Sequence, residues 1–400
     1  MGNLRKYSLF RFIAVILIMA MMALMLAGCG VDSGVGSESG SGSSEEEAAE
    51  AVGPEIKGLT YESTLDLKRA TEFSVYHYEG GYDLIDIHDS QRFLLVPEGG
   101  AAPEELDSDI IVLQKPIDRI YLAATAAMAM FVSMDALDHI RMSSIKKNAW
   151  TFDEPKEAMD RGDIIYAGKY SEPDYETMLD EQCDLALEST MIDHAPEVQE
   201  MIEDLGIPVM VDRASYEPDP MGRAEWIKLY GVLTDHEKEA TEFFEEQMDS
   251  IRELDDFENT EKTVAFFYIS TDGKVVVRRS TDYIPKMIEI AGARYVFKDL
   301  DDEEGRITVD MSVEQFYDTA KDADYIVYNG SIDSAVKTMD DLLEKDPILK
   351  QMSAVKKGNC WVTKSAMYQR TDLVAEMILD FHKLFSEDDP KDLKYMSKLE

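Results

Sequence analysis

Residues 220–257 read PMGRAEWIKLYGVLTDHEKEATEFFEEQMDSIRELDDF, and this stretch separates two halves of similar layout. Its apolar side chains recur every three or four residues, at Trp226, Leu229, Tyr230, Leu233, Ala240, Phe243, Phe244, Met248, Ile251 and Leu254. That spacing is typical of helices with one buried face. Thr234 and Glu237 match the capping-box pattern that opens a helix. We therefore expect a short helix that ends near Gly231 and a longer one over residues 235–256, which at 1.5 Å per residue would span about 33 Å.

On both sides of this stretch, short strand-forming runs alternate with helical runs, which is the pattern of an α/β fold. Connections this short favour parallel strands with right-handed crossovers. The sequence predicts an N-terminal lobe over residues 58–233, a bridging helix over 234–257 and a C-terminal lobe over 258–400. Each lobe would have three layers around a mainly parallel sheet, with a ligand cleft between the lobes. The alternative is one domain that contains a large helix.

Residues 71–96 show a different pattern, in which apolar and polar side chains alternate. Gly80-Gly81 and Asp89-Ser90 lie between the alternating runs and predict two hairpin turns. We expect an N-terminal β-meander at the edge of the first lobe.

The 400 residues include 81 acidic and 40 basic side chains, so the formal charge is −41. A surface this acidic repels phosphate backbones, and we do not expect a nucleic-acid partner. The acid excess is interpreted as a solvated surface. The six histidines show no paired spacing and no Cys/His cluster is present, so neither a bare metal ion nor a cofactor is expected.

Residues 1–28 have the pattern of an export signal, with three basic side chains among the first 11 residues and an apolar run over 12–26. The run ends in Leu26-Ala27-Gly28-Cys29, which resembles a bacterial lipobox. That resemblance implies cleavage before Cys29, lipidation of its thiol and anchoring on the extracytoplasmic face of the cell membrane. Residues 29–57 would form a flexible acidic tether. The alternative, an uncleaved anchor helix, leaves the protein on the same face.

The segment over residues 168–211 reads GKYSEPDYETMLDEQCDLALESTMIDHAPEVQEMIEDLGIPVMV. It resembles the first lobe of the solute-binding proteins of ABC importers for iron–siderophore, haem and cobalamin. Those proteins show a glycine, a helix with a glutamate (here Glu176), a strand and an LGIPV-like motif (here 205–209). Residues 312–327 repeat this order, with Glu314 in the glutamate position. The resemblance covers residues 115–385, and the meander before Lys115 departs from it.

The resemblance implies a monomeric, lipid-anchored binding protein that captures an iron chelate and delivers it to a membrane permease and its ATPase. Glu176 and Glu314 would pair with arginines of the permease. A haem or cobalamin ligand is the alternative within the family. An exported hydrolase or chelatase-like enzyme is the alternative from another class, although the sequence has no G-x-S-x-G, Walker or H-E-x-x-H motif. We expect a protein that is not an enzyme.

Ligands of open α/β sheets bind beyond the carboxyl ends of the strands, so the loops after the expected strands are candidates. These loops mix tyrosine and methionine with arginine and lysine. Guanidinium groups form bidentate hydrogen bonds with carboxylates and other anionic oxygens. Tyrosines provide flat contact area or an oxygen ligand to haem iron. The expected ligand-binding residues are Lys169, Tyr170, Arg213, Tyr268, Arg279 and Tyr368.

Overall fold

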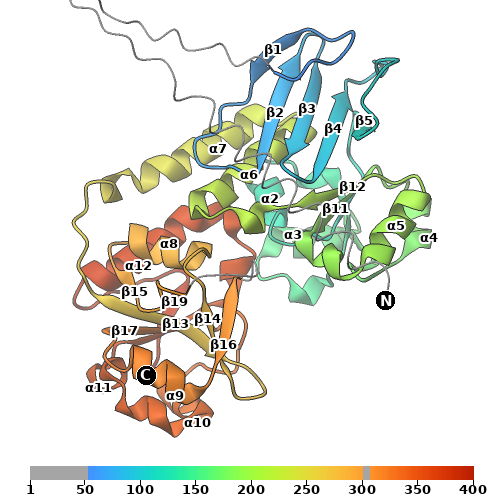
Figure 1. Ribbon diagram of the computed structural model, residues 1–400. Coiled ribbons are helices and arrows are strands. Elements are labelled where there is room, and N and C mark those ends of the chain that lie inside the picture. The colour runs from blue at the N-terminus through green and yellow to red at the C-terminus, as the bar shows by residue number, and fades with distance from the viewer. Residues whose placement is uncertain (1–52, 301–306) are drawn as a thin grey trace, which may run out of the picture. The chain divides into compact units, whose positions relative to one another are not determined.

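The computed structural model describes residues 53–300 and 307–400 of the chain (Figure 1). The expected export signal, Cys29 and most of the expected tether lie outside these residues. Within them, strands form a five-stranded N-terminal sheet, a five-stranded N-lobe sheet, a seven-stranded C-lobe sheet and a two-stranded ribbon. In this part of the chain, strands before residue 220 and strands after residue 257 pair only within their own sheets.

The N-terminal sheet has the order β1-β2-β3-β4-β5. Its strands are β1 Tyr61–Thr64, β2 Phe73–Tyr78, β3 Tyr82–Ile87, β4 Gln91–Val96 and β5 Ile110–Gln114. The first four are antiparallel neighbours, and β5 runs parallel to β4. The expected β-meander is therefore confirmed, with an added strand at each margin.

Two buried carboxylates hold the loop before β2 on the helix α6 (Pro220–Leu233). Glu225 accepts hydrogen bonds of 2.6–3.0 Å from the backbone amides of residues 68–70 and one of 2.8 Å from Lys228 Nζ. Glu217 accepts from the amides of residues 71 and 72 at 2.9–3.0 Å. Since these carboxylates satisfy successive amides of one loop, the N-terminal sheet is an integral part of the fold and not an appendage.

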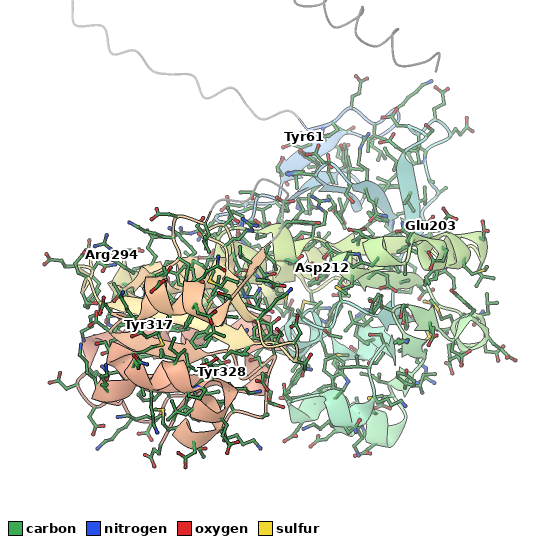
Figure 2. The ribbon with its side chains drawn as sticks, turned by 60° about the horizontal axis from the view of Figure 1, so that its bottom comes forward. Tyr61, Glu203, Asp212, Arg294, Tyr317 and Tyr328 are labelled. Carbon is green, nitrogen blue, oxygen red and sulfur yellow. The ribbon has the colours of Figure 1, made fainter. Side chains whose placement is uncertain are left out.

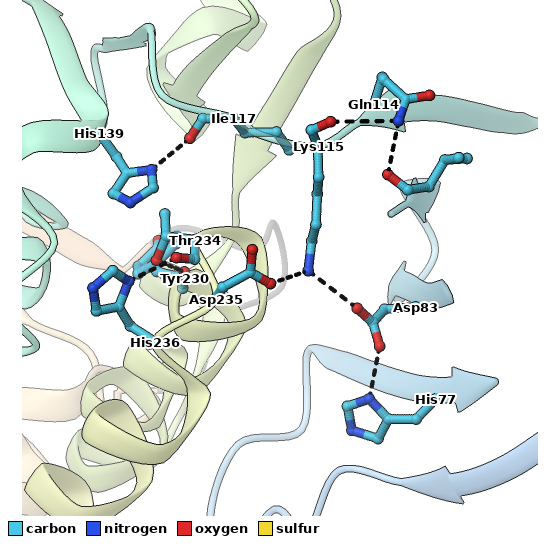
Figure 3. Close-up of polar contacts among 11 residues, drawn as sticks. His77, Asp83, Gln114, Lys115, Ile117, His139, Tyr230, Thr234, Asp235 and His236 are labelled. Carbon is cyan, nitrogen blue, oxygen red and sulfur yellow. Dashed lines mark hydrogen bonds and ion pairs between the residues drawn. The ribbon is translucent and has the colours of Figure 1, made fainter. Parts of the chain in front are cut away.

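A second polar network joins the N-terminal sheet to the turn after α6 (Figure 3). Lys115 Nζ lies 2.7 Å from Asp235 Oδ1 and 3.4 Å from Asp83 Oδ2, and His77 Nδ1 lies 2.8 Å from Asp83 Oδ1. The hydrogen bond with Asp83 raises the pKa of His77. Lys115 and Asp83 are nearly buried, so each charge depends on this pairing.

The N-lobe sheet has the order β12-β11-β6-β7-β8, and all its neighbours are parallel, as expected. Its strands are β6 Ile120–Leu122, β7 Ile140–Ser143, β8 Ile165–Tyr166, β11 Leu185–Ser189 and β12 Val209–Asp212. The connecting helices are α2 Met128–Ser133, α3 Asp153–Arg161, α4 Tyr175–Asp180 and α5 Pro196–Asp204. The ribbon pairs β9 Gly168–Lys169 with β10 Glu172–Pro173.

The C-lobe sheet has the order β16-β14-β13-β17-β18-β19, with β15 also paired to β13. Its strands are β13 Thr263–Ile269, β14 Val275–Arg278, β15 Arg294–Tyr295, β16 Thr308–Met311, β17 Tyr325–Tyr328, β18 Cys360–Thr363 and β19 Met396–Lys398. Its helices are α8 Tyr283–Ile290, α9 Val313–Ala320, α10 Met339–Lys345, α11 Ser353–Lys357 and α12 Val374–Ser386.

The C-lobe sheet is parallel only at its centre, where β13, β15, β17 and β18 run the same way, whereas β14, β16 and β19 are antiparallel to their neighbours. The expectation of a mainly parallel sheet is thus wrong at the margins of this lobe. The tight turn between β13 and β14 explains part of this, because a connection of five residues can only return the chain antiparallel.

The single helix expected over residues 235–256 is wrong in its bounds. The structure has α7 at Glu237–Ser250, about 21 Å long, followed by a 3-10 turn at Arg252–Leu254. The expected capping box is also absent, because the Thr234 hydroxyl donates to the Tyr230 carbonyl and Asp235 has a left-handed φ of 59°.

The buried helix of this segment is α6. Every residue of α6 except Arg223 is buried, and α6 contacts α2 of the N lobe and α8 and α12 of the C lobe. Its Trp226 ring also packs edge-on against Phe73 of the N-terminal sheet, with centroids 4.9 Å apart. No helix in the described part of the chain is long and apolar enough to cross a membrane.

Candidate ligand-binding face

Both lobes present the carboxyl ends of parallel strands, where ligands of α/β proteins bind. Asp212, at the end of β12, and Tyr328, at the end of β17, each mark one of these edges in Figure 2. The loops beyond the two edges carry most of the side chains described below.

Large aromatic and apolar side chains are exposed at the carboxyl edge of the N-lobe sheet. Tyr166 ends β8, Met191 follows β11 and Tyr216 follows β12, and they are 41%, 47% and 45% exposed. Lys146 Nζ lies 5.4 Å from the Tyr166 ring centroid, and the Arg213 guanidinium lies 4.5 Å from that of Tyr216. These five residues, here called the N-lobe face, combine flat contact area with positive charge.

Of the residues expected in the N lobe, Arg213 belongs to this face. It also pairs with Glu72, at 3.4 Å, and its buried Nε has no hydrogen-bond partner among the described residues. Lys169 is exposed in the ribbon and pairs with Glu172 at 3.1 Å, while Tyr170 is half-buried and packs on the adjoining core. Lys169 and Tyr170 thus lie after β8, next to the N-lobe face, and their contact with ligand stays a prediction.

In the C lobe, a polar cluster surrounds the half-buried Tyr368. Its hydroxyl oxygen accepts hydrogen bonds from Arg278 Nη2 and from Asn329 Nδ2, the latter at 2.9 Å. Arg278 is nearly buried and also pairs with Asp282, at 3.3 Å. These four residues are here called the C-lobe cluster. Because the Tyr368 oxygen accepts from both donors, its O–H group is left to donate to another molecule.

The expected Tyr268 also lies near the C-lobe cluster. Burial raises its pKa, and the positive charge of Arg278 opposes that shift. The expected Arg279 is half-buried beside the cluster, with its backbone amide bonded to the Ile307 carbonyl at 2.9 Å. Arg278, which the sequence did not single out, donates to Tyr368, and contact of Arg279 with ligand stays a prediction.

Several buried polar atoms near these edges lack hydrogen-bond partners among the described residues. They include both carboxyl oxygens of Glu188, which is the penultimate residue of β11, and Oδ1 of Asn329, which directly follows β17. Glu188 is fully buried, and burial raises its pKa to about 8. Unsatisfied polar groups are rare in folded proteins, and their presence near strand ends in both lobes is consistent with binding there.

A cavity of about 330 Å³ lies at the carboxyl ends of β17 and β18. Gly330, Thr363, Lys364 and Ser365 contribute to its walls. A Cβ on Gly330 would lie 2.3 Å from the Thr363 carbonyl oxygen, so only glycine fits. A larger cavity of about 630 Å³ lies near α8 and β15, and none of the six expected ligand-binding residues lines either cavity.

The two glutamates expected to contact the permease occupy equivalent places. Glu176 is in the first turn of α4 and Glu314 in the first turn of α9, and both are exposed. Hydrogen bonds from its own backbone amide and from Ser312 lower the pKa of Glu314. Neither carboxylate has an ion-pair partner within residues 53–300 and 307–400, which leaves both available to another protein.

The fold agrees with comparisons to known proteins. Two uncharacterized lipoproteins of Methanocaldococcus jannaschii are similar in sequence. One is 25% identical over 306 residues (72% of this chain and 71% of the relative), and the other is 28% identical over 357 residues (83% and 86%).

Among solved structures, the fold is similar to that of a possible iron-binding (periplasmic solute-binding) protein of Staphylococcus epidermidis, with a TM-score of 0.52 and 16% identity over 67% of this chain and 97% of that one. A periplasmic haem-binding protein of Vibrio cholerae gives a TM-score of 0.52 and 17% identity over 65% and 96% of the two chains. The family model for periplasmic binding proteins matches residues 139–367. The chain therefore belongs to the periplasmic binding protein family, whose members bind solutes for transport and are not enzymes.

Proposed function

We propose that this protein is the lipid-anchored solute-binding component of an ABC importer, and that it captures an iron chelate between its two lobes. The observation that carries the proposal is the pair of surfaces at the strand ends. The N-lobe face offers tyrosine rings with cations over them, and the C-lobe cluster offers a phenol oxygen held by two N–H donors.

The chemistry of these surfaces matches a large, partly flat, anionic ligand. Lys146 and Arg213 supply positive charge in a chain whose formal charge is −41, so attraction of an anion must be local. Tyrosine oxygen is a ligand that ferric iron accepts in haem proteins, and Tyr368 would take that role by exchanging one of its two N–H donors for the iron. That feature keeps haem as the second candidate ligand, with a ferric siderophore as the first.

In this proposal α6 is the helix that bridges the two lobes, whereas the sequence predicts a bridging helix over residues 234–257. It is buried between elements of both lobes, and its Arg223 guanidinium lies 4.0 Å from the ring centroid of Tyr283 in α8. The proposed lobes keep their expected bounds, 58–233 and 258–400, so α6 is the last helix of the proposed N lobe and packs on the C lobe.

The membrane and the permease complete the proposed role. The relatives in Methanocaldococcus jannaschii are lipoproteins, which supports lipidation of Cys29 and a location on the extracytoplasmic face of the cell membrane. Glu176 and Glu314 would dock a monomer onto the permease. Because both are exposed on first turns of helices, they can reach a partner without rearrangement of the fold.

The proposal is tested by titrating the purified protein with a ferric hydroxamate, a ferric catecholate, haemin and cyanocobalamin. Tryptophan fluorescence and native mass spectrometry report binding and stoichiometry. One of the two ferric chelates should bind one-to-one at micromolar concentration or tighter. Haemin binding alone would select the second candidate, and no binding by any of the four compounds would contradict the proposal.

A matched pair of tyrosine variants locates the ligand. Tyr368→Phe should weaken binding about tenfold, since it removes the oxygen that Arg278 and Asn329 hold. Tyr317→Phe, at a half-buried position on α9 in the same lobe, should leave binding unchanged. Equal affinities in the two variants would place the ligand away from the C-lobe cluster.

A further inference from the structure

One short segment of the C lobe reaches across to the N lobe. We call residues 369–372, which follow Tyr368, the strap. Gln369 Oε1 accepts hydrogen bonds from both the backbone amide and the hydroxyl of Thr151, each at 2.8 Å. Gln369 Nε2 donates to the Ala149 carbonyl at 3.0 Å. Both lone pairs of the side-chain carbonyl are thus used by a single loop of the opposite lobe.

The other end of the strap makes a second set of contacts between the lobes. Asp372 is buried, and its Oδ2 accepts from the Ser133 hydroxyl at the end of α2 at 2.7 Å. Arg370 donates to both oxygens of Asp372, at 2.8 and 3.0 Å, and its guanidinium lies 5.3 Å from the Phe152 ring centroid. The carboxylate is therefore neutralised within the strap and bonded to the N lobe.

The strap directly follows Tyr368 in the chain, and backbone hydrogen bonds tie it to the turn that ends at Tyr368. Tyr368 is the last residue of a 3-10 turn at Ser365–Tyr368, and the backbone amides of Gln369 and Arg370 both bond to the Ala366 carbonyl, at 3.0 and 3.1 Å. A displacement of the backbone at Gln369 would therefore disturb the turn that carries Tyr368. The hydroxyl of Tyr368 in turn is fixed by Arg278 and Asn329.

We propose that the strap is a latch between the lobes, which opens when solute enters or leaves and transmits that opening to Tyr368. Its contacts are mainly polar, and polar groups exchange a protein partner for water at small net cost. The strap's own contacts are thus of the kind that can separate and form again during relative motion of domains. The identity of the solute rests on the proposed function, but the latch itself does not.

Hydrogen–deuterium exchange of the full chain in detergent micelles tests the latch without any ligand. In Gln369→Ala, the amide of Thr151 loses its acceptor, and the peptide spanning residues 149–153 should exchange about tenfold faster. Gln369→Glu keeps the acceptor oxygens and loses only the donor to Ala149, so its exchange should be intermediate. Gln351→Ala, at an exposed position of the C lobe, is the control and should match the unaltered protein.

Ser133→Ala provides the second variant, because it weakens the latch from the other end and leaves the strap sequence unchanged. If the strap opens as one unit, residues 149–153 should exchange faster in this variant too. Unchanged exchange there would overturn the proposal, as would a uniform increase across the strands of both lobes, which would show a general loss of stability. Since no chelate is present, a failed ligand assignment and a failed latch give separate results.

Discussion

The buried carboxyl group of Glu188 predicts an unusual dependence of stability on pH. The side chain is fully buried, both oxygens lack partners among the described residues, and burial raises its pKa from 4.5 to about 8. Below pH 4.5 the group is neutral in folded and unfolded chains, so it adds no pH dependence to the free energy of unfolding. Between pH 4.5 and about 8, the unfolded chain gains stability by ionising while the folded chain holds the proton. The free energy of unfolding therefore falls through this window.

The size of the effect follows from the shift. Each pKa unit corresponds to about 1.4 kcal/mol, so the loss reaches about 5 kcal/mol at pH 8 and above. Glu188→Gln removes the ionisation and nearly keeps the shape of the neutral acid. The free energy of unfolding of the variant, relative to the unaltered protein, should therefore rise by about 4 kcal/mol from pH 5 to pH 8.

Urea unfolding at pH 5, 6.5 and 8, followed by tryptophan fluorescence, measures this difference. Glu217→Gln is the control, because that buried carboxylate accepts hydrogen bonds from the backbone of residues 71 and 72 and from the Trp226 indole. The Glu217→Gln variant should be less stable than the unaltered protein at all three pH values. A Glu188→Gln difference that does not change with pH would refute the reasoning, since it would show that the carboxyl group ionises as easily in the folded chain.

Three further predictions concern other parts of the fold. The pKa of His77 is raised in the folded protein, so the stability from its ion pair is complete below pH 6.5 and is lost as pH rises through the pKa of the folded state. His77→Gln should therefore lower the melting temperature at pH 6 more than at pH 9. Gly330→Ala should cost about 2–3 kcal/mol in urea unfolding, because its Cβ would meet a backbone oxygen at 2.3 Å, whereas Gly358→Ala, with a left-handed φ and open space, should cost about 1 kcal/mol. Charge reversal at Glu176 and Glu314 should abolish chelate uptake by cells and leave chelate affinity intact; reduced affinity would mean that these residues do not dock the permease.

Hydrophobic periodicity located the elements but not their ends. The helical pattern continues through Ile251 and Leu254, with no proline or glycine to mark the end of α7 at Ser250. Asp235 did carry a usable signal, because aspartate tolerates the left-handed conformation that separates α6 from α7. Reading that residue as a break would have placed the helix start near Glu237.

The choice between Arg278 and Arg279 shows a limit of a different kind. Alternate side chains of a strand point to opposite faces, so one position decides which arginine reaches Tyr368. All four residues of β14 are buried, and its run of valines shows no alternation of polar and apolar residues. The sequence therefore does not indicate which side chains point to which face of the sheet. The contact of Arg278 with Tyr368 could therefore not be predicted from the sequence, and the expected role of Arg279 in ligand binding is a separate prediction.

The sequence alone determined most of the order of strands and helices, the N-terminal meander and the loops at the strand ends. These features depend on neighbours a few residues apart, which local periodicity and turn chemistry encode. Only the tertiary structure decided that Gln369 bonds to Thr151, that Arg278 and Asn329 hold Tyr368, and that Glu188 is buried with no hydrogen-bond partner among residues 53–300 and 307–400. Such pairs are set by the packing of segments up to about 220 residues apart, for which no short stretch of sequence carries a signal.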